Sequence, residues 1–229
     1  MQLCAAQIVC LCLGLFAVGL LHKLGVHGFS HDESFGNILV GTLSFQGAAW
    51  VLILFFLRQH QVGWREAFGF RGPRLKHPLL LTLGFIVVFA VVLLLQYLSI
   101  LALDKLGWPV EDQVAVKLVT DAKSWWTTVY LGVFAVVLAP VAEEFIFRGM
   151  LFPFVKQLGF PKLAWFGVSF LFALIHLNAP TFVPLFALAL SLTWLYEKTD
   201  NLLAPITAHA LFNAANLVLL LWQNRPSHA

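Results

Sequence analysis

Charged side chains are scarce in this sequence. Only 11% of its 229 residues are Asp, Glu, Lys or Arg, whereas 60% are hydrophobic. Soluble domains carry about 25% charged and about 45–50% apolar residues. The scarcity therefore excludes an ordinary soluble domain and predicts an all-α polytopic membrane protein, because helices satisfy their own backbone hydrogen bonds inside lipid.

Linkers, internal repeats and low-complexity tracts are also lacking, so we expect one integral membrane domain over residues 1–229. The net charge of +3 is small and spread over loops, which gives no indication of a nucleic-acid partner. Cys4, Cys10 and Cys12 lie together in the first apolar segment, with no second cysteine group to complete a zinc site. That segment lacks a basic n-region and a small-residue cleavage site, so we expect a retained span rather than a removed signal peptide.

Long apolar runs are what the sequence does contain. A membrane-spanning helix needs about 20 mostly apolar residues, and the runs predict a bundle of about seven spans. The stretch 104–124 has polar residues at helical spacing, which favours an additional interfacial or re-entrant helix. The predicted spans are 3–21, 35–57, 79–103, 125 to at least 147, 162–178, 180–196 and 202–222.

The distribution of basic residues between the first two loops predicts the orientation. Loop 58–77 contains five Arg or Lys residues, whereas loop 22–34 contains only Lys23. Because basic residues favour the cytoplasmic side, we expect loop 58–77 and the N-terminus to lie inside. We expect an integral protein of a prokaryotic cytoplasmic membrane.

Three charges interrupt the apolar sequence VAEEFIFRG (residues 141–149). Eighteen uncharged residues precede Glu143, and a charged group within a span costs about 2.5–3.5 kcal/mol on insertion scales. Glu144 and Arg148 are four residues apart and can form an ion pair on one helix face. Glu143 points about 100° away and has no such local partner, so its presence favours a functional role.

Two further segments supply polar groups that could join Glu143. The segment FLFALIHLN places Phe172 and His176 four apart, and ITAHALFNAAN places His209 and Asn213 four apart. Each has a structural explanation when taken alone, because polar groups at this depth need hydrogen-bond partners. Together, a carboxylate, two imidazoles and a carboxamide could bind a metal ion or activate water.

The three segments resemble the CAAX protease and bacteriocin-processing (CPBP, or Abi) intramembrane proteases, which include type II CAAX prenyl endopeptidases. The resemblance covers about residues 125–217. One departure is visible, because the family usually has two glycines where this chain has Ala189 and Thr193. The family motifs EExxxR, FxxxH and HxxxN occur here as Glu143 to Arg148, Phe172 to His176 and His209 to Asn213.

The resemblance implies a catalytic role for four of these residues. Glu143 and His176 would activate the hydrolytic water, while His209 and Asn213 would stabilise the oxyanion. Glu144, Arg148 and Phe172 would support the site structurally.

The resemblance leaves the cofactor open between two mechanisms. The family's names include metalloprotease, and Glu143, His176 and His209 could supply three zinc ligands. A Glu–His pair with a separate oxyanion site completes the chemistry without a metal, so we favour a mechanism without a cofactor.

The helix that carries Glu143 must be longer than its apolar run. If it ended at Phe147, Glu143 would lie near the cytoplasmic membrane face, whereas His176 would lie about 22 Å from that face at 1.5 Å per residue. We therefore expect the helix to continue through GMLFPFVKQLG to about Gln157, with kinks at its two prolines. The turn at HLNAP would then lie in a polar cavity.

The leading hypothesis is an intramembrane endopeptidase that hydrolyses a peptide bond of a membrane-associated substrate. Its partners would be a peptide or protein substrate and the lipid bilayer. A non-enzymatic scaffold or bacteriocin self-immunity protein is the first alternative. A small transporter with a Glu–His proton relay is the second, although the sequence shows no inverted repeat.

Overall fold

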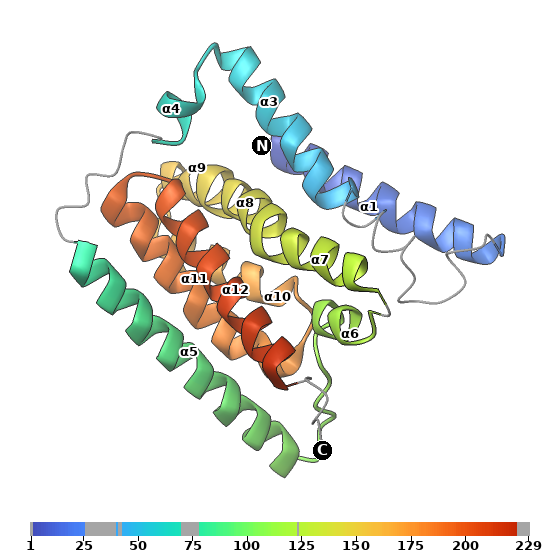
Figure 1. Ribbon diagram of the computed structural model, residues 1–229. Coiled ribbons are helices and arrows are strands. Elements are labelled where there is room, and N and C mark those ends of the chain that lie inside the picture. The colour runs from blue at the N-terminus through green and yellow to red at the C-terminus, as the bar shows by residue number, and fades with distance from the viewer. Residues whose placement is uncertain (1, 26–39, 41–42, 70–77, 123, 224–229) are drawn as a thin grey trace. The chain divides into compact units, whose positions relative to one another are not determined.

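All regular structure in the described residues is helical, which confirms the all-α prediction (Figure 1). The chain divides into two compact units, Met1–Ala67 and Phe68–Ala229. The assignment of both units to a single membrane domain stays a prediction. The computed structural model describes residues 2–25, 40, 43–69, 78–122 and 124–223.

The first unit is built around two apolar helices. Ala49, Ile53 and Leu57 recur every four residues on α3 and are buried, as expected for one packed helix face. The predicted loops 22–34 and 58–77, which set the orientation, lie partly outside the described residues. The helices of this unit are α1 (Gln2–Lys23), η1 (Leu43–Gly47), α3 (Ala48–His60) and α4 (Trp64–Ala67).

The second unit contains the remaining helices. Its helix α11 packs against α5, α10 and α12. The predicted helix within 104–124 is shorter than expected, and its placement at a membrane interface stays a prediction. The helices are α5 (Pro78–Lys105), α6 (Val114–Thr120), α7 (Trp125–Val133), α8 (Ala139–Glu144), α9 (Phe152–Gln157), α10 (Pro161–Leu174), α11 (Ala179–Thr199) and α12 (Leu203–Gln223), with π-helical stretches η2 (Phe134–Leu138) and η3 (Phe145–Leu151).

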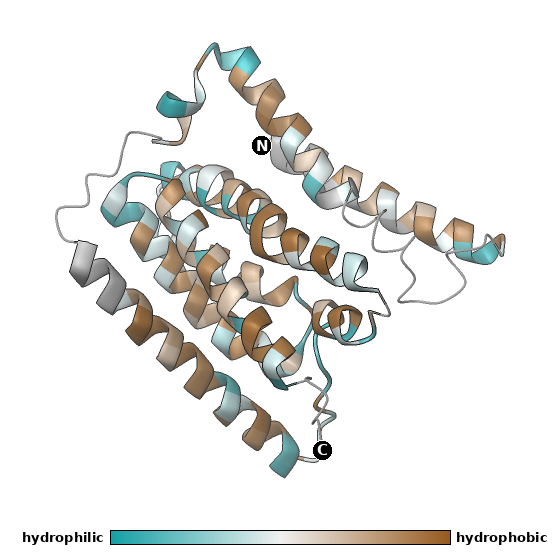
Figure 2. Cartoon of the chain, viewed as in Figure 1, coloured by the Kyte–Doolittle hydropathy of each residue, from teal (hydrophilic) through white to brown (hydrophobic). Residues whose placement is uncertain are grey.

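Four described helical segments are long and apolar enough to cross a membrane, so the count of about seven spans is not confirmed. The other predicted spans correspond to shorter apolar helices. Apolar residues cover most of α5 (Figure 2), and many of their side chains are exposed. Exposed apolar faces of this extent are rare on soluble proteins and fit contact with lipid. The four long segments are Gly84–Lys105, Trp125–Gln157, Ala179–Thr199 and Leu203–Gln223.

The helix that carries Glu143 runs without interruption from Trp125 to Gln157, which confirms the predicted continuation to Gln157. Two π-helical stretches, η2 and η3, interrupt its α-helical register. Pro140 and Pro153 each lie two residues after one of these stretches. Proline has no backbone N–H, so each of these two residues removes one hydrogen bond of the helix. Both π-helical stretches therefore lie next to a missing backbone donor.

Candidate active site

The predicted Glu144–Arg148 ion pair is present and completely buried. Nη1 of Arg148 donates to Oε1 of Glu144 at 2.8 Å, and both side chains are 0% exposed. Nη2 donates to the carbonyl of Ala189 at 2.8 Å, and Nε donates to Oγ1 of Thr193 at 3.4 Å. Arg148 therefore ties η3 to α11 through two of its nitrogen atoms, Nη2 and Nε, and pairs with Glu144 on its own helix through the third.

The two positions that depart from the family pattern are the ones that receive Arg148. Ala189 and Thr193 are both 0% exposed and lie four residues apart on α11. Small side chains let helices approach closely, so the close contact persists without the glycines. The Thr193 hydroxyl adds an acceptor that glycine would lack. Sequence reasoning missed this role, although two small residues one turn apart were a usable signal.

His209 lies between the two glutamates. Its Nδ1 is 2.9 Å from Oε1 of Glu144, and its Nε2 is 3.8 Å from Oε2 of Glu143. Because a carboxylate accepts, Nδ1 is the donor, and this bond fixes the orientation of the ring. The partner that Glu143 lacks on its own helix therefore comes from α12.

The charges of this cluster do not balance without a proton on His209 or Glu143. Glu143 (−1), Glu144 (−1) and Arg148 (+1) sum to a net charge of −1. The side chain of Glu143 is 15% exposed, and His209 is 3% exposed. An uncompensated charge is costly at such depth.

The ring of Phe172 packs between the two imidazoles. It is 0% exposed, and its centroid lies 5.0 Å from that of His176 and 5.7 Å from that of His209. The guanidinium carbon of Arg148 lies 4.9 Å from the same centroid, within the range of cation–π attraction. Phe172 therefore fixes the spacing of both histidines, consistent with a supporting role.

His176 lies at the end of α10 and is half-buried. Its Nδ1 is 2.7 Å from the carbonyl of Phe172. A carbonyl can only accept, so Nδ1 is the donor and Nε2 of the neutral ring is an acceptor. No hydrogen bond or ion pair joins His176 to Glu143 among the described residues.

The two residues nevertheless lie at comparable depth in the bundle. Glu143 precedes Gln157 by fourteen residues, about 21 Å, and His176 follows Pro161 by fifteen, about 22 Å. The connection between these helices is only residues 158–160. The extended helix thus removes the separation that a helix ending at Phe147 would impose.

The side-chain amide of Asn213 forms a hydrogen bond to the backbone of the helix that carries Glu143. Its Nδ2 donates to the carbonyl of Ala135 in η2 at 2.8 Å. In this stretch the N–H of Ala139 bonds to the carbonyl of Phe134, five residues back. The next such bond, from residue 140 to Ala135, cannot form because Pro140 has no N–H. Asn213 supplies the missing donor and retains a second amide hydrogen.

The three predicted zinc ligands do not form a metal site in this structure. Within the described part of the chain, no three His, Cys, Asp or Glu side chains are grouped so that they could hold a metal ion. His209 lies near Glu143, and the other nitrogen of His209 is bonded to Glu144. A metal-bound histidine usually donates its other N–H to a carboxylate or a carbonyl, so this contact is compatible with a zinc ligand and the choice between the two mechanisms stays a prediction.

The comparison with protein families agrees with the motifs. Residues 125–215 match the family model described as "Type II CAAX prenyl endopeptidase Rce1-like". This confirms the resemblance, and the match includes every predicted site residue from Glu143 to Asn213. No curated protein and no solved structure gives a significant match to the chain.

Proposed function

We propose that this chain, whose residues 125–215 match the Rce1-like type II CAAX prenyl endopeptidase family model, is an intramembrane peptidase. Its substrate would be a peptide bond in a membrane-associated peptide or protein. The observation that carries the proposal is the position of His209 between Glu143 and Glu144, deep in an apolar bundle. A structural Glu–Arg pair needs neither the second carboxylate nor the imidazole.

Glu143 acts as the general base. Its carboxylate takes a proton from water, and the water oxygen forms a bond to the carbonyl carbon of the peptide. Glu143 is the more exposed of the two glutamates, which suits contact with water. His176, with Nδ1 bonded to the Phe172 carbonyl, offers Nε2 as an acceptor for a second hydrogen of that water.

His209 stabilises the oxyanion that forms when water attacks. Because Glu144 holds Nδ1 of His209, the other nitrogen, Nε2, is the atom that faces Glu143 and would donate to the oxyanion. Asn213 contributes its second amide hydrogen. When the tetrahedral intermediate collapses, the C–N bond breaks and the proton on Glu143 passes to the leaving nitrogen.

Glu144 positions His209 and does not contact the substrate. It accepts from Nδ1 of His209 and from Arg148 on the same oxygen. The arrangement resembles the way a carboxylate orients a histidine in other hydrolases. Arg148 balances this carboxylate and anchors it to α11.

The proposed mechanism uses no metal, because Glu143 as the base and His209 with Asn213 as oxyanion donors complete the hydrolysis without one. Active protein should contain far less than one zinc per chain, and chelators should leave cleavage unchanged. Elemental analysis of purified active protein checks this. A stoichiometric zinc that is lost with His176→Ala or His209→Ala would contradict the mechanism.

The activity is tested by incubating purified, membrane-reconstituted protein with a peptide library and detecting products by mass spectrometry. Glu143→Gln should lower cleavage by about 10²–10⁴-fold without changing the melting temperature, because glutamine keeps the shape and removes the base. Asp104→Asn, an exposed carboxylate at the end of α5, is the matched control. Cleavage by Glu143→Gln at the control rate would refute the mechanism, and full cellular function without cleavage would favour a non-enzymatic scaffold.

A further inference from the structure

The loop between α5 and α6 is tied to the turn between α10 and α11. Residues 108–113 of this loop contain no helix. Nε2 of Gln113 donates to Oγ1 of Thr181 at 2.8 Å. Nδ2 of Asn178 donates to the backbone carbonyl of Glu111 at 2.9 Å. Two hydrogen bonds therefore join segments that lie 68 and 67 positions apart in the sequence.

Asn178 is the centre of this contact. It is the N-cap residue of α11, and its Oδ1 accepts from the backbone N–H of Thr181 at 3.2 Å and from its hydroxyl at 2.8 Å. The same hydroxyl accepts from Gln113, so the bonds form a chain across the contact. Hydrogen bonds linked in this way strengthen one another. The turn is thus held both by α11 and by the loop.

The residue between His176 and Asn178 has an unfavourable backbone conformation. Leu177 has a φ of 48°, a left-handed value that a residue other than glycine keeps only where the surrounding structure imposes it. Its side chain is 89% exposed, so its own packing does not impose the conformation. The hydrogen bonds of its two neighbours do so, from His176 to the Phe172 carbonyl and from Asn178 to the loop.

His176 depends on this turn for its position. The helix α10 ends at Leu174, and the N–H of His176 bonds to the carbonyl of Ala173, only three residues back, at 3.3 Å. Helix ends with such bonds open more readily than helix interiors. A catalytic group must be held within about 0.5 Å of its working position, and a misplacement of about 1 Å can cost 10²-fold in rate.

We propose that Asn178 is a positioning residue for His176. Its carboxamide fixes the turn after α10 against α11 and against the loop 108–113. The fixed turn keeps Nδ1 of His176 bonded to the Phe172 carbonyl, which leaves Nε2 as an acceptor. The inference rests on the proposed function in one step, the role of that acceptor in holding the attacking water. Asn178 itself lies outside the motif FxxxH and touches no reacting atom.

The first test measures the tautomer of His176 without any substrate. The full chain, labelled with isotope-enriched histidine, is studied in detergent by NMR at a pH at which the ring is neutral, and His176→Gln identifies the signal. The wild type should show only the tautomer with its hydrogen on Nδ1. Asn178→Ala should add a measurable population with the hydrogen on Nε2, because the loosened turn releases the bond to Phe172.

The second test measures turnover of the same variants after reconstitution into membranes. Asn178→Ala should lower kcat by about 10–10²-fold with KM unchanged, because the lost interaction concerns the transition state and not substrate binding. In a His176→Ala background the same substitution should cause no further loss, since residues that act as a unit are not additive. Asn178→Ser keeps a helix cap and loses the donor to Glu111. It should lower kcat by about fivefold, the size of one net hydrogen bond.

Asn201→Ala is the matched control. Asn201 follows the other end of α11, where its Oδ1 accepts from the N–H of Leu203 at 2.9 Å, so this variant also loses a helix cap. It should keep the wild-type tautomer of His176. A change equal to that in Asn178→Ala would overturn the positioning role.

Three further outcomes decide the inference. A wild-type tautomer in Asn178→Ala would overturn it, and so would wild-type turnover in Asn178→Ser. An equal loss of turnover from Asn178→Ala with and without His176 would also overturn it. Since the tautomer is measured without cleavage, a changed tautomer in a protein that cleaves no peptide would support the positioning of the ring and refute the proposed function.

Discussion

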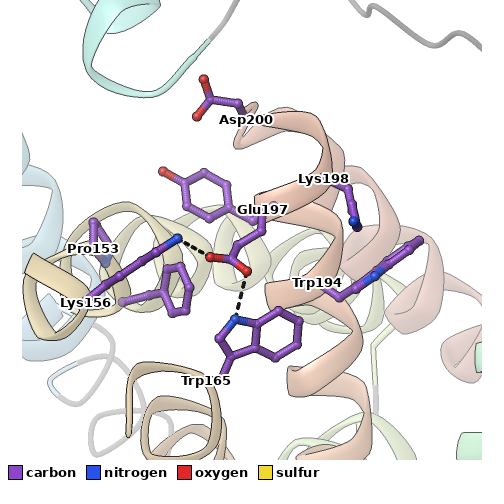
Figure 3. Close-up of a pocket in the computed structure, with 9 residues that line it drawn as sticks. Pro153, Lys156, Trp165, Trp194, Glu197, Lys198 and Asp200 are labelled. Carbon is purple, nitrogen blue, oxygen red and sulfur yellow. Dashed lines mark hydrogen bonds and ion pairs between the residues drawn. The ribbon is translucent and has the colours of Figure 1, made fainter. Parts of the chain in front are cut away.

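Two glutamate–cation pairs involve the helix that carries Glu143, and the two pairs differ in burial. Glu144 and Arg148 are both 0% exposed, whereas the side chains of Lys156 and Glu197 are 50% and 24% exposed. Lys156 lies eight residues after Arg148 on the same helix and is hydrogen-bonded to Glu197 (Figure 3). On α11, Glu197 lies four residues after Thr193, which accepts a hydrogen bond from Arg148. The same type of ion pair thus occurs in the apolar interior and at the end of the spans.

The cation of the buried pair makes more hydrogen bonds than the cation of the exposed pair, whereas Oε2 of the buried Glu144 has no hydrogen-bond partner among the described residues. Arg148 makes hydrogen bonds through three nitrogen atoms, and Glu144 also receives His209. Guanidinium suits such a site because its donors form a fixed planar fork, while the ammonium of lysine is compact and strongly hydrated. Water can replace partners only at the exposed pair. Burial therefore favours arginine over lysine as the cation of the pair, and it increases the stability that is lost when that cation is removed.

The largest effect on stability is expected from Arg148→Met. It removes the guanidinium charge that balances Glu144 and leaves this buried carboxylate with only its bond from His209, which costs about 3–5 kcal/mol. Unfolding in detergent, followed by circular dichroism, measures the loss. Lys156→Met is the matched control at the exposed pair and should cost at most about 1 kcal/mol. Equal losses of stability in the two variants would contradict the claim that burial makes the Glu144–Arg148 pair the more important one.

A second prediction compares the ring N–H donors of the two glutamates. His209 donates to Glu144, and Trp165 donates to Glu197. His209→Ala should lower turnover by about 10²–10³-fold, as for a lost oxyanion donor. Trp165→Phe removes the donor to Glu197. Turnover should stay unchanged, because the pocket that Trp165 lines (Figure 3) contains none of the proposed catalytic residues. Steady-state cleavage rates of folded variants decide this, and equal losses would place both sites in one mechanism.

Local spacing predicted the parts of the site that lie within one helix. The all-α fold, the Glu144–Arg148 pair and the helix through Gln157 follow from helical periodicity and rise per residue. The count of about seven spans is not confirmed, because four of the described segments are long and apolar enough to cross a membrane and the other apolar helices are shorter. Apolar content alone did not reveal where these helices end.

Contacts between helices were not predictable from the sequence alone. The bond between His209 and Glu144 joins residues 65 positions apart, and Asn213 reaches Ala135 over 78 positions. Such contacts depend on how helices rotate and shift against each other. Spacing along one helix does not determine that relation. The motifs indicated which residues carry the polar groups, and the packing determined which of these residues meet.

Asn213 provides a test at intermediate burial. Asn213→Ala should cost about 1–3 kcal/mol, because the Ala135 carbonyl loses its donor. In a Pro140→Ala background the new backbone N–H can bond to a carbonyl of η2, so the same substitution should cost much less. A double-mutant cycle on unfolding free energies measures this coupling.

Turnover in the same four proteins separates the two roles of Asn213. If its amide also stabilises the oxyanion, Pro140→Ala will restore the stability of Asn213→Ala and leave its turnover low. Additive stability losses, with no coupling to Pro140, would contradict the proposed donor relationship with Ala135.

The smallest effect is expected from Glu197→Gln at the exposed pair. Glutamine removes the charge that Lys156 contacts and keeps an oxygen that can accept from Trp165. The free energy of unfolding should therefore fall by about 0–1 kcal/mol. Because salt screens exposed charges over about 3 Å at 1 M ionic strength, the difference from wild type should vanish in high salt. The loss in Arg148→Met should persist under the same conditions, since a buried pair is little screened. Denaturant titrations at low and high salt measure both values. A salt-independent loss in Glu197→Gln as large as that in Arg148→Met would show that burial does not separate the two pairs.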